Sequence, residues 1–312
     1  MTTCTGGVWA ATLTPMNTDL SIDLDRLNTH VFWLLDRGCD GVALLGTTGE
    51  ANSLSLKERL AVIDAAGAAA FPADKIMTGV GCCAAGDTLE LSRAAIAAGY
   101  PNLLMLPPFY YKGVSEEGLF RSYANIIEEL NDDRARIIVY DFPQMTGLEI
   151  SADLLVRLRE AFPDTVIGIK DSSGNWDDMK EACDRLPGFS VFAGTEKYLL
   201  PVLRAGGAGC ISATANVTSP ALANLMANWR NSVADELQEV ATELRIALQK
   251  YPPAPALKEL MAISTGEQRW RSLRPPMVNL INEKIESLRS DLHKIDFDVK
   301  DLSKTTELRS TI

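Results

Sequence analysis

The chain has 312 residues with 46% hydrophobic and 23% charged residues, values typical of a globular protein. It lacks the roughly 18 consecutive apolar residues of a membrane span, and its amino terminus has no basic signal-peptide region, so we expect no membrane partner and a cytoplasmic location. The net charge of -11, without a Lys/Arg cluster longer than a pair, argues against nucleic acid as a partner.

The counts of histidine and cysteine narrow the chemistry. The two histidines, His30 and His293, fall in stretches typical of ordinary helix positions, whereas a Ser-His-Asp triad or a His-rich metal site needs at least one histidine. The six cysteines lack C-x-x-C spacing and the density of a disulfide scaffold. We therefore expect free thiols, no metal, and chemistry that uses Lys, Tyr, Thr and carboxylates.

Along the first 230 residues, short apolar runs alternate with longer stretches of helical periodicity. Eight strict strand-helix units favour a closed barrel over an open doubly wound sheet, which usually has five or six strands. The predicted fold class is therefore α/β, a (β/α)8 TIM barrel. Strands are predicted at 7–15, 41–46, 75–81, 102–107, 136–143, 165–172, 189–194 and 209–216, and helices at 23–38, 55–70, 87–99, 116–130, 151–162, 176–186, 196–206 and 220–230.

From about residue 226 the pattern becomes helical only, with proline-rich breaks at 251–260 and 274–277. We predict a barrel domain over 1–225 and a C-terminal helical domain over 226–312. The polar segment from 298 onward is expected to be a loosely ordered tail.

The functional face of such a barrel lies at the carboxyl ends of the strands. The second strand ends in Gly46-Thr47-Thr48-Gly49, where threonine hydroxyls and backbone N–H groups could hold a small carboxylate. The fourth strand is followed by an aromatic loop with Tyr110 and Tyr111, which could line a pocket or contact another subunit. The fifth ends at Tyr140, which places a phenol at the barrel mouth.

Lys170 closes the apolar sixth strand, Ile167-Gly168-Ile169-Lys170-Asp171. Burying an ammonium group costs several kcal/mol unless the group is paired or loses its proton. A lysine that loses its proton in this way is a nucleophile toward carbonyls. The sequence therefore predicts a Schiff base on Lys170, and an iminium is itself an electron sink, so that no cofactor is needed.

The runs GTTGE, YDFPQMTG, GIKDSSG and GCISATANV, in this order, resemble those of the dihydrodipicolinate synthase / N-acetylneuraminate lyase family of class I aldolases. The resemblance covers roughly residues 6 to 280. It implies a barrel with C-terminal helices, usually a tetramer, that binds pyruvate or a 2-oxo acid yielding it. The resemblance implies that Lys170 forms the imine and that Tyr140 and Thr47 transfer protons together with Tyr111 of a neighbouring subunit. It also implies that Thr48 and the backbone after Gly46 bind the pyruvate carboxylate. The main chain at Ile211 would line the pocket.

Two departures from the family pattern bear on the substrate. Met145 stands where the synthase branch has an arginine for the carboxylate of aspartate semialdehyde, and a thioether cannot replace that bidentate contact. In the sugar-acid lyase branch an acidic pair follows the glycine that ends the seventh strand, and here that pair reads Glu196-Lys197. We expect both residues to contact a hydroxylated 2-oxo acid with a second anionic group. Asp141 also replaces an asparagine common after the catalytic tyrosine.

The leading hypothesis is thus a pyruvate-linked class I aldolase or lyase, forming a homo-oligomer. The alternatives are 4-hydroxy-tetrahydrodipicolinate synthase and a 2-keto-3-deoxy sugar acid dehydratase that use the same imine. A non-catalytic sensor would need none of the relay residues. A phosphate-binding barrel enzyme needs a glycine-rich nest after the seventh or eighth strand, whereas the glycines at 206–209 precede the eighth.

Overall fold

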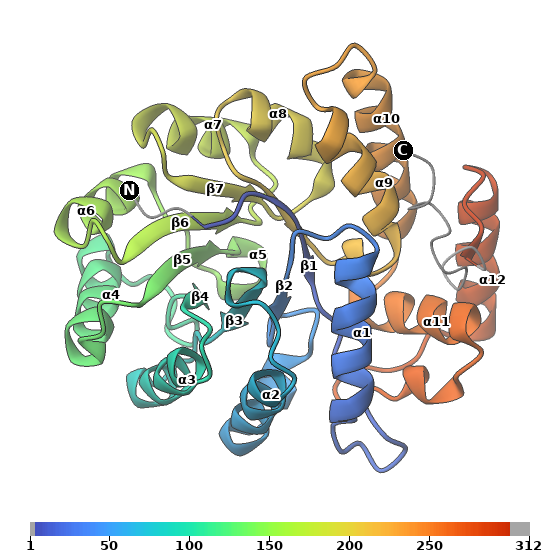
Figure 1. Cartoon of the computed structure of the whole chain (residues 1–312), viewed down its shortest axis with the longest axis horizontal. Coiled ribbons are helices and arrows are strands. Elements are labelled where there is room, and N and C mark those ends of the chain that lie inside the picture. The colour runs from blue at the N-terminus through green and yellow to red at the C-terminus, as the bar shows by residue number, and fades with distance from the viewer. Residues whose placement is uncertain (1–3, 300–312) are drawn as a thin grey trace.

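The computed structural model describes residues 4–299, and eight parallel strands form a closed barrel in it (Figure 1). Each strand pairs with its neighbours in the chain, and the first pairs with the eighth. The predicted (β/α)8 barrel is therefore confirmed. The strands are β1 (Gly7–Ala11), β2 (Gly41–Leu44), β3 (Ile76–Gly79), β4 (Asn102–Met105), β5 (Arg136–Asp141), β6 (Val166–Asp171), β7 (Ser190–Ala193) and β8 (Gly209–Ser212).

Helices surround the barrel, and several begin at a side-chain cap; Ser55, for example, forms a reciprocal capping box with Glu58. Among the described residues, no helix is long and apolar enough to cross a bilayer. The barrel helices are α1 (Leu24–Asp36), α2 (Leu56–Ala68), α3 (Ala85–Ala97), α4 (Glu116–Leu130), α5 (Pro143–Thr146), α6 (Ala152–Ala161), α7 (Trp176–Arg185), α8 (Leu199–Arg204) and α9 (Ala215–Asn228), with 3-10 turns η1 (Ala51–Ser53), η2 (Ala73–Lys75) and η3 (Glu196–Tyr198).

The C-terminal part of the described chain comprises α10 (Ala234–Leu248), α11 (Pro253–Thr265), η4 (Gln268–Arg271) and α12 (Asn282–His293). These helices gather on one side of the barrel, with α10 packed on α9 (Figure 1). The predicted boundary at 225/226 falls inside α9. Nearly all of the predicted polar tail, from residue 300 onward, lies outside the described residues.

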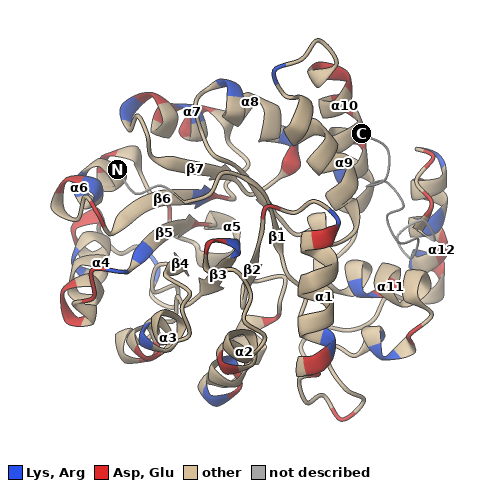
Figure 2. Cartoon of the chain, viewed as in Figure 1, with Lys and Arg blue, Asp and Glu red and all other residues tan. Residues whose placement is uncertain are grey.

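Two apolar layers hold the barrel together, one inside the sheet and one between the sheet and the helices. The interior layer includes Trp9, Met77, Ile138 and Phe192, all fully buried. Charged residues lie mainly on helices and loops, and the strands are mostly uncharged (Figure 2). Parallel strands covered on both faces have this composition because both sets of alternating side chains are buried.

A β-bulge in β6 changes which side chains enter the barrel. Ile137 of β5 pairs with Val166 and the next residue, Ile138, pairs with Gly168, so Ile167 is the extra residue. Ile167 belongs to the interior layer, whereas Ile169 packs in the outer layer, although strict alternation would put both on one face. The shift places the side chain of Lys170, two residues after Gly168, on the interior face of the barrel.

A buried ion pair connects the C-terminal helices to the loop after β2. Lys258 of α11 bonds to Glu50, and both side chains are fully buried. Lys258 Nζ also donates to the Ser272 carbonyl at 2.8 Å, and the Arg274 N–H donates to the second Glu50 oxygen at 3.0 Å. Glu50 adopts a left-handed backbone conformation, φ 58°, which this fully paired carboxylate helps to maintain.

We predict that Gly168→Ala destabilises the protein. A Cβ at this position would lie 2.5 Å from the Ser190 carbonyl oxygen of β7, and backbone cannot move aside without distorting the sheet. The expected loss in the free energy of unfolding is about 1–3 kcal/mol, measured by urea denaturation. Gly86→Ala is the control, because a Cβ there meets nothing within 4 Å and helix α3 should gain stability. Equal stability of Gly168→Ala and wild type would contradict the packing argument.

Candidate active site

A cavity of about 470 Å3 opens at the carboxyl ends of the strands and extends to the C-terminal helices. Six of the residues predicted from the sequence line it, namely Thr47, Thr48, Tyr140, Lys170, Lys197 and Ile211. The others that line it are Phe142, Gln144, Met145, Ser172, Ser173, Gly174, Gly194, Thr195, Tyr198, Ala213, Arg245, Gln249, Pro252, Pro253, Ala254, Pro255 and Met277.

Lys170 and Tyr140 lie side by side on the inner face of the barrel mouth. They are register partners on β6 and β5, and Lys170 Nζ lies 4.2 Å from the centroid of the Tyr140 ring. Their exposed fractions are only 4% and 3%. Lys170 forms no ion pair among the described residues, and its nitrogen lies over a ring rather than beside a carboxylate.

The loop after β2 lines the same cavity. Thr48 is buried, and Thr47 borders both the main cavity and a smaller one of about 20 Å3. Tyr140 and Gly46 also line the small cavity, so the loop and the phenol share a boundary. The Gly49 carbonyl accepts a hydrogen bond at 2.7 Å from Thr14, which anchors the loop to the residues after β1.

Two residues of the predicted site lie elsewhere. Tyr111 is 72% exposed and packs edge-on against Tyr110 outside the cavity. Glu196 is fully buried in η3 and faces β8, where its carboxylate accepts hydrogen bonds from Ser212 and Thr214. It is not among the residues that line the cavity because these two hydroxyls hold its carboxylate beneath the wall.

The sequence reasoning missed the contribution of the C-terminal helices. Arg245 and Gln249 reach the cavity from α10 and the residues after it, and the turn at 252–255 closes the same side. No local pattern distinguishes Arg245 from other helical arginines. Only the packing of α10 on α8 and η3 reveals its place.

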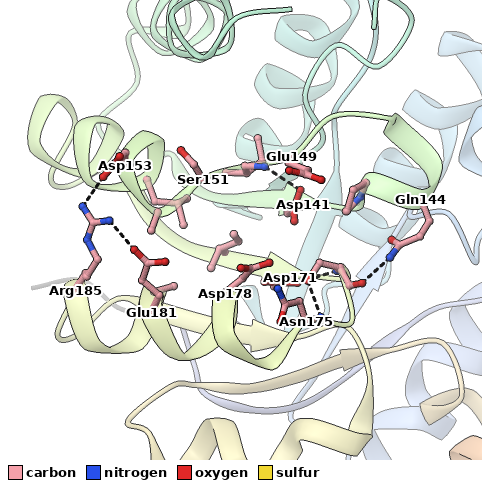
Figure 3. Close-up of a pocket in the computed structure, with 17 residues that line it drawn as sticks. Asp141, Gln144, Glu149, Ser151, Asp153, Asp171, Asn175, Asp178, Glu181 and Arg185 are labelled. Atoms are coloured by element: carbon pink, nitrogen blue, oxygen red, sulfur yellow. Dashed lines mark hydrogen bonds and ion pairs between the residues drawn. The ribbon is translucent and has the colours of Figure 1, made fainter. Parts of the chain in front are cut away.

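A second cavity, about 680 Å3 in volume, lies on the other side of β5 and β6, between α6 and α7 (Figure 3). The residues that follow Tyr140 and Lys170 in the chain, Asp141 and Asp171, point into it because side chains alternate along a strand. Burial and then the charge of Asp171 raise the pKa of Asp141 to about 7. Burial also raises the pKa of Asp171, while hydrogen bonds from Ser173 lower it.

Comparison with known proteins agrees with this geometry. The model of the dihydrodipicolinate synthetase family matches residues 4–295. The chain belongs to this family. It is 32% identical to an uncharacterized DapA-like lyase of Chloroflexus aurantiacus, over 93% of this chain and 96% of that protein. It is 30% identical to the 4-hydroxy-tetrahydrodipicolinate synthase of Thiobacillus denitrificans, over 91% and 95%.

Solved structures of the family share the fold. The dihydrodipicolinate synthase of Agrobacterium tumefaciens superposes with a TM-score of 0.84 at 33% identity, over 93% of this chain and 99% of that one. YagE of Escherichia coli K12, a family member solved in complex with pyruvate, gives 0.85 at 25% identity, over 94% and 99%. The family and the barrel with C-terminal helices inferred from the sequence motifs are thus confirmed.

The position of Met145 bears on which substrates the cavity can bind. It lies in α5, directly after β5, is 62% exposed and lines the cavity mouth. A thioether there offers no charge to an anionic group of a substrate. The cations that do line the cavity are Lys170, Lys197 and Arg245, and none of the described residues lining it is acidic.

We predict that Asp141→Asn stabilises the protein in a pH-dependent manner. A carboxyl with a pKa of 3.8 when unfolded and about 7 when folded costs stability as the pH rises from 4 to 7, and the full cost persists above 7. The amide oxygen can still accept the Ile150 N–H bond. The gain in unfolding free energy should reach up to about 4 kcal/mol at pH 8 and nearly vanish at pH 4.

Urea denaturation at both pH values checks this prediction. The control is Asp164→Asn, because Asp164 is exposed in the loop between α6 and β6, so the change should stay within about 0.5 kcal/mol. An equal gain for Asp141→Asn at pH 4 and pH 8 would contradict the assignment to the carboxylate charge.

Proposed function

We propose that this protein is a class I, Schiff-base lyase that cleaves a 2-oxo acid to pyruvate and an aldehyde, with Lys170 as the nucleophile. The carrying observation is the buried amine of Lys170, placed 4.2 Å from the Tyr140 ring in a cavity without carboxylates among its described lining residues. The lining described for this cavity gives the Lys170 nitrogen no carboxylate to pair with, which leaves it open to attack a carbonyl carbon bound there.

The reaction begins at the 2-oxo carbon. Lys170 Nζ attacks it, Tyr140 donates its phenolic proton to the carbonyl oxygen, and loss of that oxygen as water leaves a protonated imine and the Tyr140 phenolate. Thr48 and the backbone after Gly46 hold the adjacent carboxylate, since buried hydroxyl and N–H donors bind a carboxylate well in a site of low polarity.

Tyr140 handles the proton in the bond-breaking step. Its phenolate takes the proton of the 4-hydroxyl, the C3–C4 bond breaks, and the electron pair moves into the iminium to give an enamine and an aldehyde. Tyr140 then returns the proton to C3, and water releases pyruvate from Lys170 while the Tyr140 phenolate takes back the proton set free by this hydrolysis. Thr47, which shares a boundary with Tyr140, relays protons between the phenol and solvent.

The oligomeric state is part of the proposal. The exposed pair Tyr110 and Tyr111, together with Val114, forms an apolar surface at the loop after β4. We place it at a contact between subunits of a homo-oligomer, where Tyr111 would extend the relay of Tyr140 and Thr47 in the neighbouring subunit.

The expected trapping result is a covalent adduct of pyruvate on Lys170 after reduction with borohydride. Mass spectrometry of the intact protein and peptide mapping measure it. Lys170→Ala should abolish the adduct, and Lys112→Ala, which removes a lysine bonded to carbonyls outside the cavity, should not. An adduct on another lysine, or no adduct with wild type, would contradict the Schiff-base mechanism on Lys170.

The substrate prediction is that cleavage of hydroxylated 2-oxo acids exceeds condensation of pyruvate with aspartate semialdehyde. Met145 replaces a guanidinium-carboxylate contact, and losing such a contact lowers kcat/KM on the order of 100-fold. Pyruvate release coupled to lactate dehydrogenase measures cleavage. A condensation kcat/KM above about 10^4 M⁻¹s⁻¹ with no cleavage would restore 4-hydroxy-tetrahydrodipicolinate synthase as the activity.

A further inference from the structure

The charges that line the active-site cavity are all positive, although the protein as a whole carries a net charge of -11. Lys170 is assigned to the imine. The other two cations, Lys197 and Arg245, come from η3 after β7 and from α10. One pyruvate carboxylate carries a single negative charge, whereas two cations remain besides the nucleophile. The positive charge of the cavity therefore favours a ligand with a further negative group.

Arg245 has unused hydrogen-bonding capacity. A guanidinium has five N–H donors. Within residues 4–299, its guanidinium donates to Glu196 Oε2 from Nη1 at 3.5 Å, and its buried Nε has no acceptor. Its side chain is 21% exposed, so it is partly shielded from water where it meets the cavity. Leaving a buried donor unpaired costs stability, and an acceptor oxygen of an anionic ligand would remove that cost.

Glu196 explains how Arg245 is held. Ser212 Oγ donates to its carboxylate at 2.7 Å and Thr214 donates to the other oxygen, so two hydroxyls fix the carboxylate beneath the wall. The carboxylate then attracts Nη1 without engaging the guanidinium in a bidentate pair, which leaves the remaining donors for a ligand. Glu196 is therefore a positioning residue.

Lys197 supplies the second cation. It follows Glu196 directly in η3 and lines the cavity, and none of the described carboxylates forms an ion pair with it. Because Glu196 turns toward β8, its neighbour Lys197 is free to face the cavity. Glu196 therefore holds the cation Arg245 in place, whereas Lys197 is itself a cation in the cavity lining.

We propose that Arg245 and Lys197 form a subsite for a second anionic group at the end of the substrate remote from the oxo carbon. The substrate class is accordingly a 2-oxo acid that carries a distal carboxylate or phosphate. This inference rests on the proposed lyase function, and it deepens that function by assigning specificity to a residue of the C-terminal helices.

The test compares substrates that differ only in the distal group. Wild type, Arg245→Gln and Arg245→Lys are assayed for pyruvate release from 4-hydroxy-2-oxoglutarate, with a distal carboxylate, and from 4-hydroxy-2-oxopentanoate, with a methyl group there. A phosphorylated and an unphosphorylated 2-keto-3-deoxygluconate tell whether the distal anion is phosphate. Arg204→Gln is the matched control, since Arg204 pairs with Asp235 at the start of α10, on the surface.

We expect wild type to prefer the dianionic member of at least one pair by about 10-fold or more in kcat/KM. Arg245→Gln should lower kcat/KM for that substrate by about 100-fold and for its counterpart without the distal anion by less than about 3-fold. Arg245→Lys should recover part of the loss, and Arg204→Gln should match wild type. Equal losses on both members, or a wild type without preference for either dianion, would overturn the subsite.

A binding measurement separates this proposal from the proposed function and does not depend on the stability of a variant. The thermal stabilisation of wild type by 2-oxoglutarate is compared with that by 2-oxopentanoate, which has the same carbon chain and a methyl end. Greater stabilisation by 2-oxoglutarate supports the subsite even if borohydride traps no pyruvate, in which case the lyase function alone fails. Equal stabilisation by the two acids counts against the subsite even if pyruvate is trapped.

Discussion

The candidate site depends on one irregularity in one strand, the bulge at Ile167. Without it, alternation along β6 would turn Lys170 toward the helices and away from the Tyr140 ring. The bulge needs Gly168, because the backbone of β7 lies too close for any side chain there. The bulge interrupts the pairing of β5 with β6, and it places Lys170 Nζ beside the Tyr140 ring. The acid-base chemistry we propose follows from that placement.

The same two strands also separate two electrostatic environments. On the inner side, Tyr140 and Lys170 face a cavity whose charged residues are cations, and on the outer side Asp141 and Asp171 face a cavity rich in carboxylates (Figure 3). The outer pair raises the cost of folding at neutral pH, because two buried carboxyls cannot both ionise cheaply. Functional regions commonly carry such unfavourable groups where the surrounding barrel is stable enough to tolerate them.

The sequence was sufficient for the architecture and for the centre of the site, and insufficient for its periphery. Eight apolar runs with intervening helical periods predict the barrel because both patterns are local. Lys170 stood out because an ammonium at the end of an apolar strand is costly. The direction of Glu196 was not predictable, since it depends on Ser212 and Thr214 of another strand end. The bulge was equally hidden, because the residues 166, 167 and 169 are all apolar.

The C-terminal helices are part of the active-site wall as well as a support for it. Lys258 fixes Glu50, which lies in the loop of Thr47 and Thr48, so α11 stabilises the surface proposed to hold the pyruvate carboxylate. Helix α10 supplies Arg245 to the lining of the same cavity. The strands thus carry the groups for bond cleavage, while the appended helices set the charge that the far end of a substrate meets. In such an arrangement, substitutions on α10 or η3, or at Met145, can change specificity and leave the proposed imine chemistry on β5 and β6 in place.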